Sequence, residues 1–249
     1  MSENILILGA TSGIARALCH RLAKRGCRLV IAGRDADELT RIARDLEVRY
    51  DAGVFVEPFD AMDWDNHPTF FDRCVQRFDG NLSGAVLCFG YLPEQEETEV
   101  DFSELRRTVE VNFVSAVSIL NRVAAHLEEQ GKGFIAAISS VAGDRGRQSN
   151  YTYGAAKAAL SVYLQGLRNR LQHAHVHVLT VKPGFVDTPM TQGRLNPDSL
   201  LVASPERVAR DMDRGIRKGK NVVYSPWYWR AVMGAVCSIP ETIFKRMKM

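Results

Sequence analysis

The segment Ile5-Leu6-Ile7-Leu8-Gly9-Ala10-Thr11-Ser12-Gly13-Ile14-Ala15 decides the fold of this 249-residue chain. Its four consecutive apolar residues predict a strand that is buried on both faces, as in a parallel sheet. The glycines predict a tight turn, and Ile14, Leu18 and Leu22 recur at helical spacing. Glycines let the backbone approach a ligand closely, and the amides at a helix N-terminus attract negative charge. The segment therefore predicts a cradle for a phosphate-bearing ligand.

Further apolar runs alternate with helical patterns along the chain. We place strands near residues 4–8, 28–32, 53–57, 83–88, 134–138, 176–182 and 221–224. A long helix is predicted from Phe102 to Leu127, with Asn112 interrupting its apolar stripe. This alternation predicts an α/β fold: a single Rossmann-like, doubly wound parallel sheet of about seven strands, with helices on both faces and a C-terminal helical segment.

Composition and charge narrow the classes of function. The 32 basic residues nearly balance the 29 acidic ones, and a net charge of +3 does not indicate nucleic-acid binding. The five cysteines are Cys19, Cys27, Cys74, Cys88 and Cys237. Their scattered spacing argues against a disulfide framework and against a zinc site, and we expect no bound metal. The first strand begins almost at once, so we expect no signal peptide and a cytoplasmic protein.

A serine, a tyrosine and a lysine form the candidate catalytic group. Tyr153 stands four residues before Lys157, so both side chains emerge on one face if this segment is helical. The lysine ammonium favours the phenolate and is expected to lower the pKa of the tyrosine, which suits proton exchange with a substrate oxygen. Ser140 stands thirteen residues before Tyr153 and follows an apolar run, and its hydroxyl could hold the same oxygen.

These residues together resemble the short-chain dehydrogenase/reductase family from residue 4 to about residue 225. The family's active-site Asn, Ser, Tyr and Lys match Asn112, Ser140, Tyr153 and Lys157 in order and spacing. This chain departs from the family at two places. Ala15 stands where the third glycine of the cofactor turn is usual, and of the family's Asn-Asn-Ala-Gly motif only the glycine, Gly90, is present. The cofactor-binding residues that the resemblance implies are Gly9, Thr11, Ser12, Gly13, Ile14, Arg34, Asp60, Gly90, Tyr153, Lys157, Pro183, Gly184 and Thr188.

The end of the second predicted strand distinguishes two cofactors. Arg34 is placed to pair with the ribose phosphate of NADP through a permanently charged guanidinium. Asp35 either binds the ribose hydroxyls of NAD or caps the following helix. We expect NADP(H), with NAD(H) as the alternative.

The resemblance implies reduction of a ketone to a secondary alcohol. The cofactor's nicotinamide would deliver hydride to the carbonyl carbon while Tyr153 protonates the oxygen. Lys157 would bind the nicotinamide ribose, Ser140 would orient the carbonyl, and Asn112 would link the lysine to solvent. Two alternatives stay open: a reductase of a soluble ketone, steroid or 3-ketoacyl substrate, and a non-catalytic dinucleotide-binding regulator.

The last residues suggest an additional contact. We expect a dinucleotide-binding catalytic domain over residues 1–225 and an aromatic, basic helical extension over residues 226–249. Its apolar stretch of about a dozen residues is too short to cross a bilayer. Interfacial aromatic residues and the basic Lys245, Arg246 and Lys248 suit a segment lying on a membrane surface or closing over a lipid-like substrate. A helix packed on another subunit of a homo-oligomer is the alternative.

Four segments resemble a subgroup of the family that reduces polyprenyl-phosphoryl 2-keto-pentoses to precursors of cell-wall polysaccharide. They are Lys218–Pro226, Ser238–Lys245, Phe89–Leu92 and Ser139–Arg147. This resemblance implies a lipid-linked sugar substrate, a flavin oxidase partner that makes the ketone, and a peripheral position at the membrane. Arg145 and Arg147 would then lie near the substrate, or else be solvated loop residues.

Overall fold

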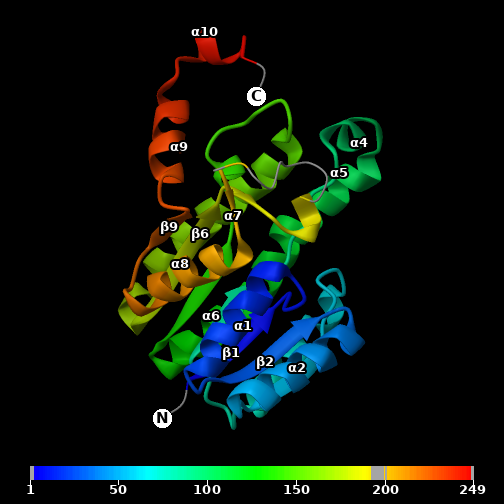
Figure 1. Ribbon diagram of the computed structural model, residues 1–249, viewed down its shortest axis with the longest axis vertical. Coiled ribbons are helices and arrows are strands. Elements are labelled where there is room, and N and C mark those ends of the chain that lie inside the picture. Colours follow the sequence, from blue (N-terminus) through cyan, green and yellow to red (C-terminus); the bar gives the residue numbers. More distant parts are fainter. Residues whose placement is uncertain (1–2, 192–198, 200, 248–249) are drawn as a thin grey trace.

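The central sheet matches the predicted strands closely. The computed structural model describes residues 3–191, 199 and 201–247 (Figure 1). Its seven parallel strands run in the order β3-β2-β1-β4-β5-β6-β9. The strands are β1 (Asn4–Leu8), β2 (Arg28–Gly33), β3 (Val54–Pro58), β4 (Gly84–Leu87), β5 (Gly133–Ile138), β6 (Val176–Pro183) and β9 (Val222–Ser225). Every predicted strand is confirmed, because each begins and ends within one residue of its predicted bounds.

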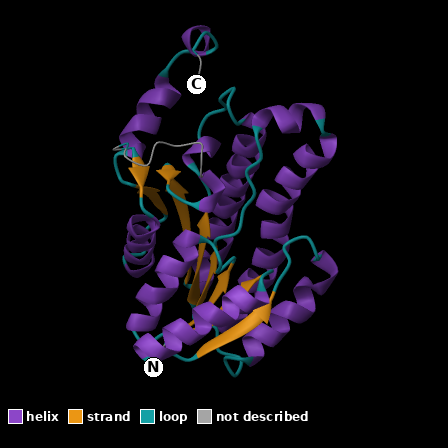
Figure 2. Cartoon of the chain, turned by 45° about the vertical axis from the view of Figure 1, so that its right-hand side comes forward, coloured by secondary structure: helices purple, strands orange, loops and turns teal. Residues whose placement is uncertain are grey.

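Helices cover both faces of this sheet (Figure 2). One face packs against α1 (Gly13–Lys24), α2 (Ala36–Tyr50) and α8 (Pro205–Arg217). The other packs against α3 (His67–Gln76), α6 (Ser115–Gln130) and α7 (Tyr151–Leu171). Strand β1 shows why both faces are apolar: Ile5 and Ile7 belong to the first core, and Leu6 and Leu8 to the second. The predicted doubly wound sheet is thereby confirmed.

The strand order reverses between β1 and β4, which creates a crevice at their carboxyl ends. Gly9 ends β1 with a φ of +81°, a conformation that favours glycine. A Cβ at this position would lie 2.6 Å from the backbone nitrogen of Phe89 after β4. Ser12 caps α1 by accepting a hydrogen bond from the backbone nitrogen of Ala15 at 3.3 Å. The glycine turn thus lets the two loops meet.

The predicted helix over 102–127 is wrong in one respect. It comprises α5 (Phe102–Val109), a π-helical turn (Glu110–Val114) and α6, which continues to Gln130. The π turn contains Asn112, the residue that interrupts the apolar stripe. π-bulges of this kind are frequent at functional sites. Helix α4 (Gln95–Val100) precedes α5.

The C-terminal segment is helical, as predicted. Helices α9 (Trp229–Ser238) and α10 (Glu241–Phe244) rise from the end of the sheet at the top of Figure 1. A small sheet of β7 (Phe185–Val186) and β8 (Val202–Ala203) was not predicted, since two-residue strands carry no periodic signal. No helix in the described part of the chain has the length and apolar character needed to cross a membrane.

Candidate active site

A cavity of about 930 Å³ lies at the carboxyl edge of the sheet. Loops after six strands line it, from the turn after β1 to the turn after β6. It contains all thirteen predicted cofactor-binding residues: Gly9, Thr11, Ser12, Gly13, Ile14, Arg34, Asp60, Gly90, Tyr153, Lys157, Pro183, Gly184 and Thr188. This volume suits a small-molecule or cofactor site. Among the described residues, no group of His, Cys, Asp and Glu side chains is arranged to hold a metal ion.

Three of the four predicted catalytic residues line this cavity. Ser140 enters from the loop after β5, while Tyr153 and Lys157 come from the first two turns of α7. The Lys157 ammonium lies 5.6 Å from the centroid of the Tyr153 ring, so the two share one helix face. Asn112 is 1 % exposed and lies behind the cavity wall.

Lys157 is fixed through the end of β5. Its Nζ donates a hydrogen bond to the carbonyl oxygen of Ile138 at 3.1 Å. The hydroxyl of Ser139 donates to the backbone oxygen of Lys157 at 3.0 Å, and lies 2.8 Å from the hydroxyl of Ser161. The neighbour of the candidate catalytic serine therefore anchors the helix that carries the tyrosine and the lysine.

Asn112 connects the π turn to the loop after β4. Its Nδ2 donates to the carbonyl oxygens of Tyr91 at 2.6 Å and Thr108 at 2.9 Å, and its Oδ1 accepts from the Tyr91 nitrogen at 3.2 Å. A Cβ on Gly90 would lie 3.0 Å from this Oδ1 and 3.4 Å from Lys157 Nζ. A side chain at position 90 would therefore crowd both the asparagine and the lysine.

Burial controls the ionisation of the tyrosine and the lysine. It raises the pKa of Tyr153 to about 12, against a smaller lowering by a hydrogen bond with Ser140. Burial also lowers the pKa of Lys157 to about 8. We expected Lys157 to lower the pKa of Tyr153; instead, desolvation of the phenolate dominates. The phenol therefore stays protonated near neutral pH and can donate a proton.

At the end of the cavity after β2, Arg34 is better placed than Asp35 to contact a bound cofactor. Arg34 is exposed and lines the cavity. The carboxylate of Asp35 accepts a hydrogen bond from the backbone nitrogen of Glu38 at 2.9 Å, which makes Asp35 the N-cap of α2. Of the two roles considered for Asp35, the cap is the one seen here. The Asp60 carboxylate accepts from the Met62 nitrogen at 2.9 Å and also faces the cavity.

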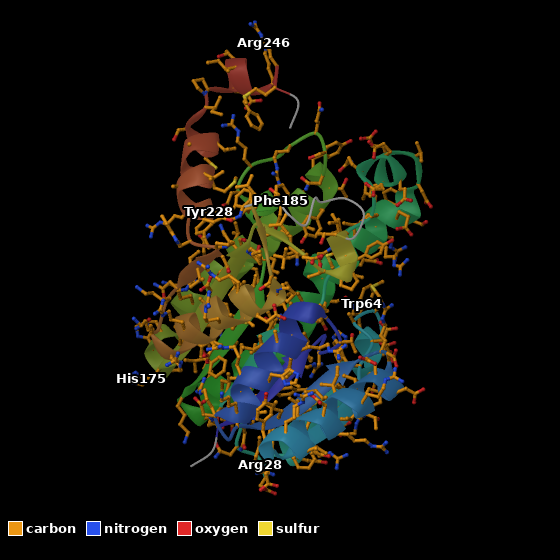
Figure 3. The ribbon with its side chains drawn as sticks, in the orientation of Figure 1. Arg28, Trp64, His175, Phe185, Tyr228 and Arg246 are labelled. Carbon is orange, nitrogen blue, oxygen red and sulfur yellow. The ribbon has the colours of Figure 1, made fainter. Side chains whose placement is uncertain are left out.

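The C-terminal segment forms a support that the sequence did not indicate. Trp229 of α9 is 4 % exposed and packs behind the Pro183-Gly184 turn, with its ring centroid 5.3 Å from that of Phe185. A Cβ on Gly184 would lie 1.9 Å from Trp229 Nε1, so the indole occupies the space beside the glycine. Figure 3 shows Phe185 and Tyr228 at this junction and Arg246 at the far tip.

The loop after Ser140 also holds the C-terminal segment. Arg145 donates to the carbonyl oxygens of Val236 and Ile239, both at 2.6 Å, and its guanidinium lies 3.7 Å from the centroid of the Phe244 ring. It also pairs with Glu241 at 3.1 Å. Arg147, two residues later, lines the cavity instead. The two arginines considered together in the sequence thus have separate surroundings.

A second set of contacts ties this loop to the sheet. Asp144 forms an ion pair with Lys182 of β6 and accepts a hydrogen bond from the Tyr224 hydroxyl of β9 at 2.9 Å. These residues lie 38 and 80 positions apart in the chain, so no local pattern could have indicated them.

Comparison with known proteins agrees with this geometry. Residues 3–198 match the short chain dehydrogenase family. An uncharacterized oxidoreductase of Mycobacterium tuberculosis is 37% identical over 243 residues, covering 98% of this chain and 96% of that protein. An uncharacterized oxidoreductase of Streptomyces coelicolor is 35% identical over 246 residues, again covering 98% and 96%.

Among solved structures, a short-chain dehydrogenase from Sphingobium yanoikuyae in complex with NADPH superposes with a TM-score of 0.82 at 22% identity, covering 96% of this chain and 97% of that one. Actinorhodin polyketide ketoreductase with NADPH superposes with a TM-score of 0.80 at 22% identity, covering 90% and 95%. These likenesses show the shared fold.

Proposed function

The chain belongs to the short-chain dehydrogenase family, and we propose that it reduces a ketone to a secondary alcohol with NADPH. One observation carries this proposal. A single cavity is lined at one end by the glycine turn and Arg34, and at the other by Ser140, Tyr153 and Lys157. A dinucleotide laid along it would bring its nicotinamide to the catalytic side chains. Two structures with this fold contain NADPH, which supports the choice of cofactor.

The residues divide the chemistry among them. Bound NADPH would supply the hydride. The Ser140 hydroxyl holds the substrate carbonyl in reach of Tyr153, whose high pKa keeps a proton on the phenol for transfer to the forming alkoxide. Lys157 would hold the nicotinamide ribose by hydrogen bonds. Asn112 keeps the loop after β4 in place, so that Gly90 leaves room beside the lysine.

For the substrate, we propose a lipid-linked keto-sugar. The supporting feature is the resemblance of four segments to the reductase subunit of decaprenylphosphoryl-ribose 2′-epimerase, which reduces a polyprenyl-phosphoryl 2-keto-pentose made by a flavin oxidase. The exposed Trp227, Ile243 and Met247 on the C-terminal segment, with Lys245 and Arg246, suit contact with a membrane surface. The oxidase partner and peripheral membrane binding belong to the same proposal.

Two other functions are the alternatives: reduction of a soluble substrate, and dinucleotide binding without catalysis, as in a regulator. A reductase of soluble ketones, steroids or 3-ketoacyl substrates would use the same catalytic residues. Whichever substrate the protein takes, we also propose that it forms a homo-oligomer, which would cover exposed apolar side chains such as Val100 and Phe102, 88% and 74% exposed.

NADPH consumption with two sets of ketones tests the function. The protein should consume NADPH with at least one ketone and much less NADH under the same conditions. Turnover of a polyprenyl-linked keto-pentose above that of soluble ketones would support the lipid-linked substrate. Tight NADPH binding without consumption for any ketone would instead indicate a dinucleotide-binding regulator.

A further inference from the structure

The loop between Ser140 and Tyr153 carries two arginines in contrasting environments. Arg145 has four hydrogen-bond acceptors and an aromatic ring, all in the C-terminal segment. Arg147 has no ion pair or hydrogen bond with any described residue, and its Nε is buried without a partner. Arg145 therefore binds the C-terminal segment to this loop, whereas Arg147 lines the cavity.

An unpartnered, partly buried guanidinium is costly. Burial lowers the pKa of Arg147, which shows that its surroundings solvate the cation poorly. An arginine nonetheless keeps its charge in proteins and has five N–H donors to satisfy. A buried N–H donor without an acceptor destabilises the folded protein, and an anionic ligand that accepts its hydrogen bond would remove that cost. Structural arginines elsewhere in the chain, such as Arg168, are paired with backbone or side-chain oxygens.

A third arginine at the cavity provides a comparison. Arg107 of α5 lies 3.6 Å from the Glu104 carboxylate, and its guanidinium stacks 4.4 Å from the centroid of the Tyr91 ring. Both its charge and its planar face are therefore already engaged. Among the described residues, Arg147 has neither an ion-pair partner nor a stacked ring.

Arg147 and Arg34, the residue proposed to bind the cofactor's ribose phosphate, follow different strands of the sheet. Arg34 follows β2, whereas Arg147 follows β5, three strands further along the sheet. At about 4.8 Å between neighbouring strands, the two strand ends lie roughly 14 Å apart. The neighbours of Arg147 in the loop after β5 and at the start of α7, Ser149, Asn150 and Tyr153, also line the cavity. Arg147 stands six residues before Tyr153 in the chain, and both line this cavity.

We propose that Arg147 binds an anionic group of the substrate, a phosphate ester or a carboxylate, while Tyr153 acts on the carbonyl. This inference rests on the proposed reductase function and assigns the class of ketone that the site selects. A guanidinium binds either anion through two parallel hydrogen bonds. Fixing the anion at Arg147 and the carbonyl oxygen at Tyr153 defines two points of the substrate and so limits how it can lie against the nicotinamide.

Matched pairs of ketones with and without the anion test this assignment. We would compare xylulose 5-phosphate with xylulose, and acetoacetate with its neutral methyl ester. A short isoprenoid phosphodiester of the same keto-pentose distinguishes a lipid-linked phosphate from a soluble one. The variants are Arg147→Gln and Arg147→Lys, and Arg49→Gln is the control because it removes the same charge from an exposed ion pair on α2.

For the preferred anionic ketone, Arg147→Gln should lower kcat/KM by about 10- to 100-fold, the range for a lost charge-assisted hydrogen bond. The loss should appear mainly in KM, and the neutral ketone of the pair should change by no more than about two-fold, since the proton donor is untouched. Arg147→Lys should retain part of the preference. Inorganic phosphate should compete with the anionic ketone in the wild type and much less in Arg147→Gln.

Two measurements keep this inference distinct from the reductase function. Equal losses for anionic and neutral ketones, with normal NADPH binding, would overturn the role of Arg147 and leave the reductase intact. If no ketone is reduced, calorimetric binding of xylulose 5-phosphate to the NADP⁺-saturated protein decides the point. Weaker binding to Arg147→Gln than to Arg49→Gln supports anion recognition, and equal binding contradicts it.

Discussion

Replacing Tyr153 with phenylalanine removes the proposed proton donor and little else. The phenol lines the cavity, and its protein partner is the Ser140 hydroxyl. A phenylalanine ring fills the same space on α7, so packing of the helix against β6 should persist. The contacts of Lys157 with Ile138 and Ser139 do not involve the phenol and should also remain.

The size of the effect follows from the chemistry that is lost. With the pKa of Tyr153 raised to about 12, the phenol is protonated throughout the neutral range and is the donor positioned beside Ser140. Loss of a general acid typically lowers turnover by about 10²- to 10⁴-fold. This corresponds to roughly 3–5 kcal/mol of transition-state stabilisation, at 1.36 kcal/mol for each factor of ten. We expect this loss in kcat, with NADPH affinity nearly unchanged.

The assay measures NADPH oxidation with a reducible ketone and, separately, NADPH binding by fluorescence. Tyr163→Phe is the matched control, because Tyr163 lies on the same helix and its hydroxyl bonds to Asn121 at 2.8 Å. That variant should lose about 0.5–1.5 kcal/mol of stability and keep its activity. Near-normal turnover of Tyr153→Phe, with intact NADPH binding, would refute the assignment of the proton donor.

Three further outcomes are expected. Arg34→Ala should weaken NADPH binding by on the order of 1–3 kcal/mol and leave NADH binding nearly unchanged, whereas equal losses would contradict the phosphate contact. Because burial lowers the pKa of Lys157 to about 8, its ammonium is charged below that pH and neutral above it. NADPH affinity measured against pH should therefore fall as the pH rises through this value, and Lys157→Gln should remove that step. A chain ending at Ser225, if it folds and binds NADPH, should no longer sediment with anionic liposomes and should lose activity on polyprenyl-linked ketones. If instead the full chain does not bind liposomes, and the truncation turns an oligomer into a monomer, the C-terminal segment is a subunit contact.

The features that sequence could predict are local in the chain. Each strand of the sheet is a short apolar run bounded by glycine, proline or polar residues, so its position can be found within a residue. The pair Tyr153 and Lys157 has the spacing of one helical turn, and Ser140 follows the apolar run 134–138 after one intervening residue. The glycine turn 9–13 joins a strand to a helix. Backbone periodicity alone is enough to bring these groups to the same edge of the sheet.

The features that sequence could not predict depend on distant contacts. The π turn at Asn112 accompanies hydrogen bonds to Tyr91, twenty-one residues earlier, and helical periodicity carries no sign of them. The balance of pKa effects at Tyr153 depends on how deeply its surroundings are buried, which only packing decides. Trp229 lies beside Gly184 through the approach of α9 to the turn after β6. A tryptophan near the C-terminus gives no indication of that neighbour.

The C-terminal contacts refine the truncation experiment. Trp229 supports the Pro183-Gly184 turn, and Arg145 binds the carbonyl oxygens of Val236, Cys237 and Ile239, so a chain ending at Ser225 loses support for the cavity together with any membrane contact. A chain ending at Ile239 keeps the tryptophan and all three carbonyl acceptors, and lacks α10 and the basic residues that follow. Each basic residue near an anionic surface contributes about 1 kcal/mol. If the chain ending at Ile239 loses liposome binding but still reduces soluble ketones, the end of the chain binds the membrane. If the chain ending at Ser225 also loses reduction of soluble ketones, α9 belongs to the catalytic structure.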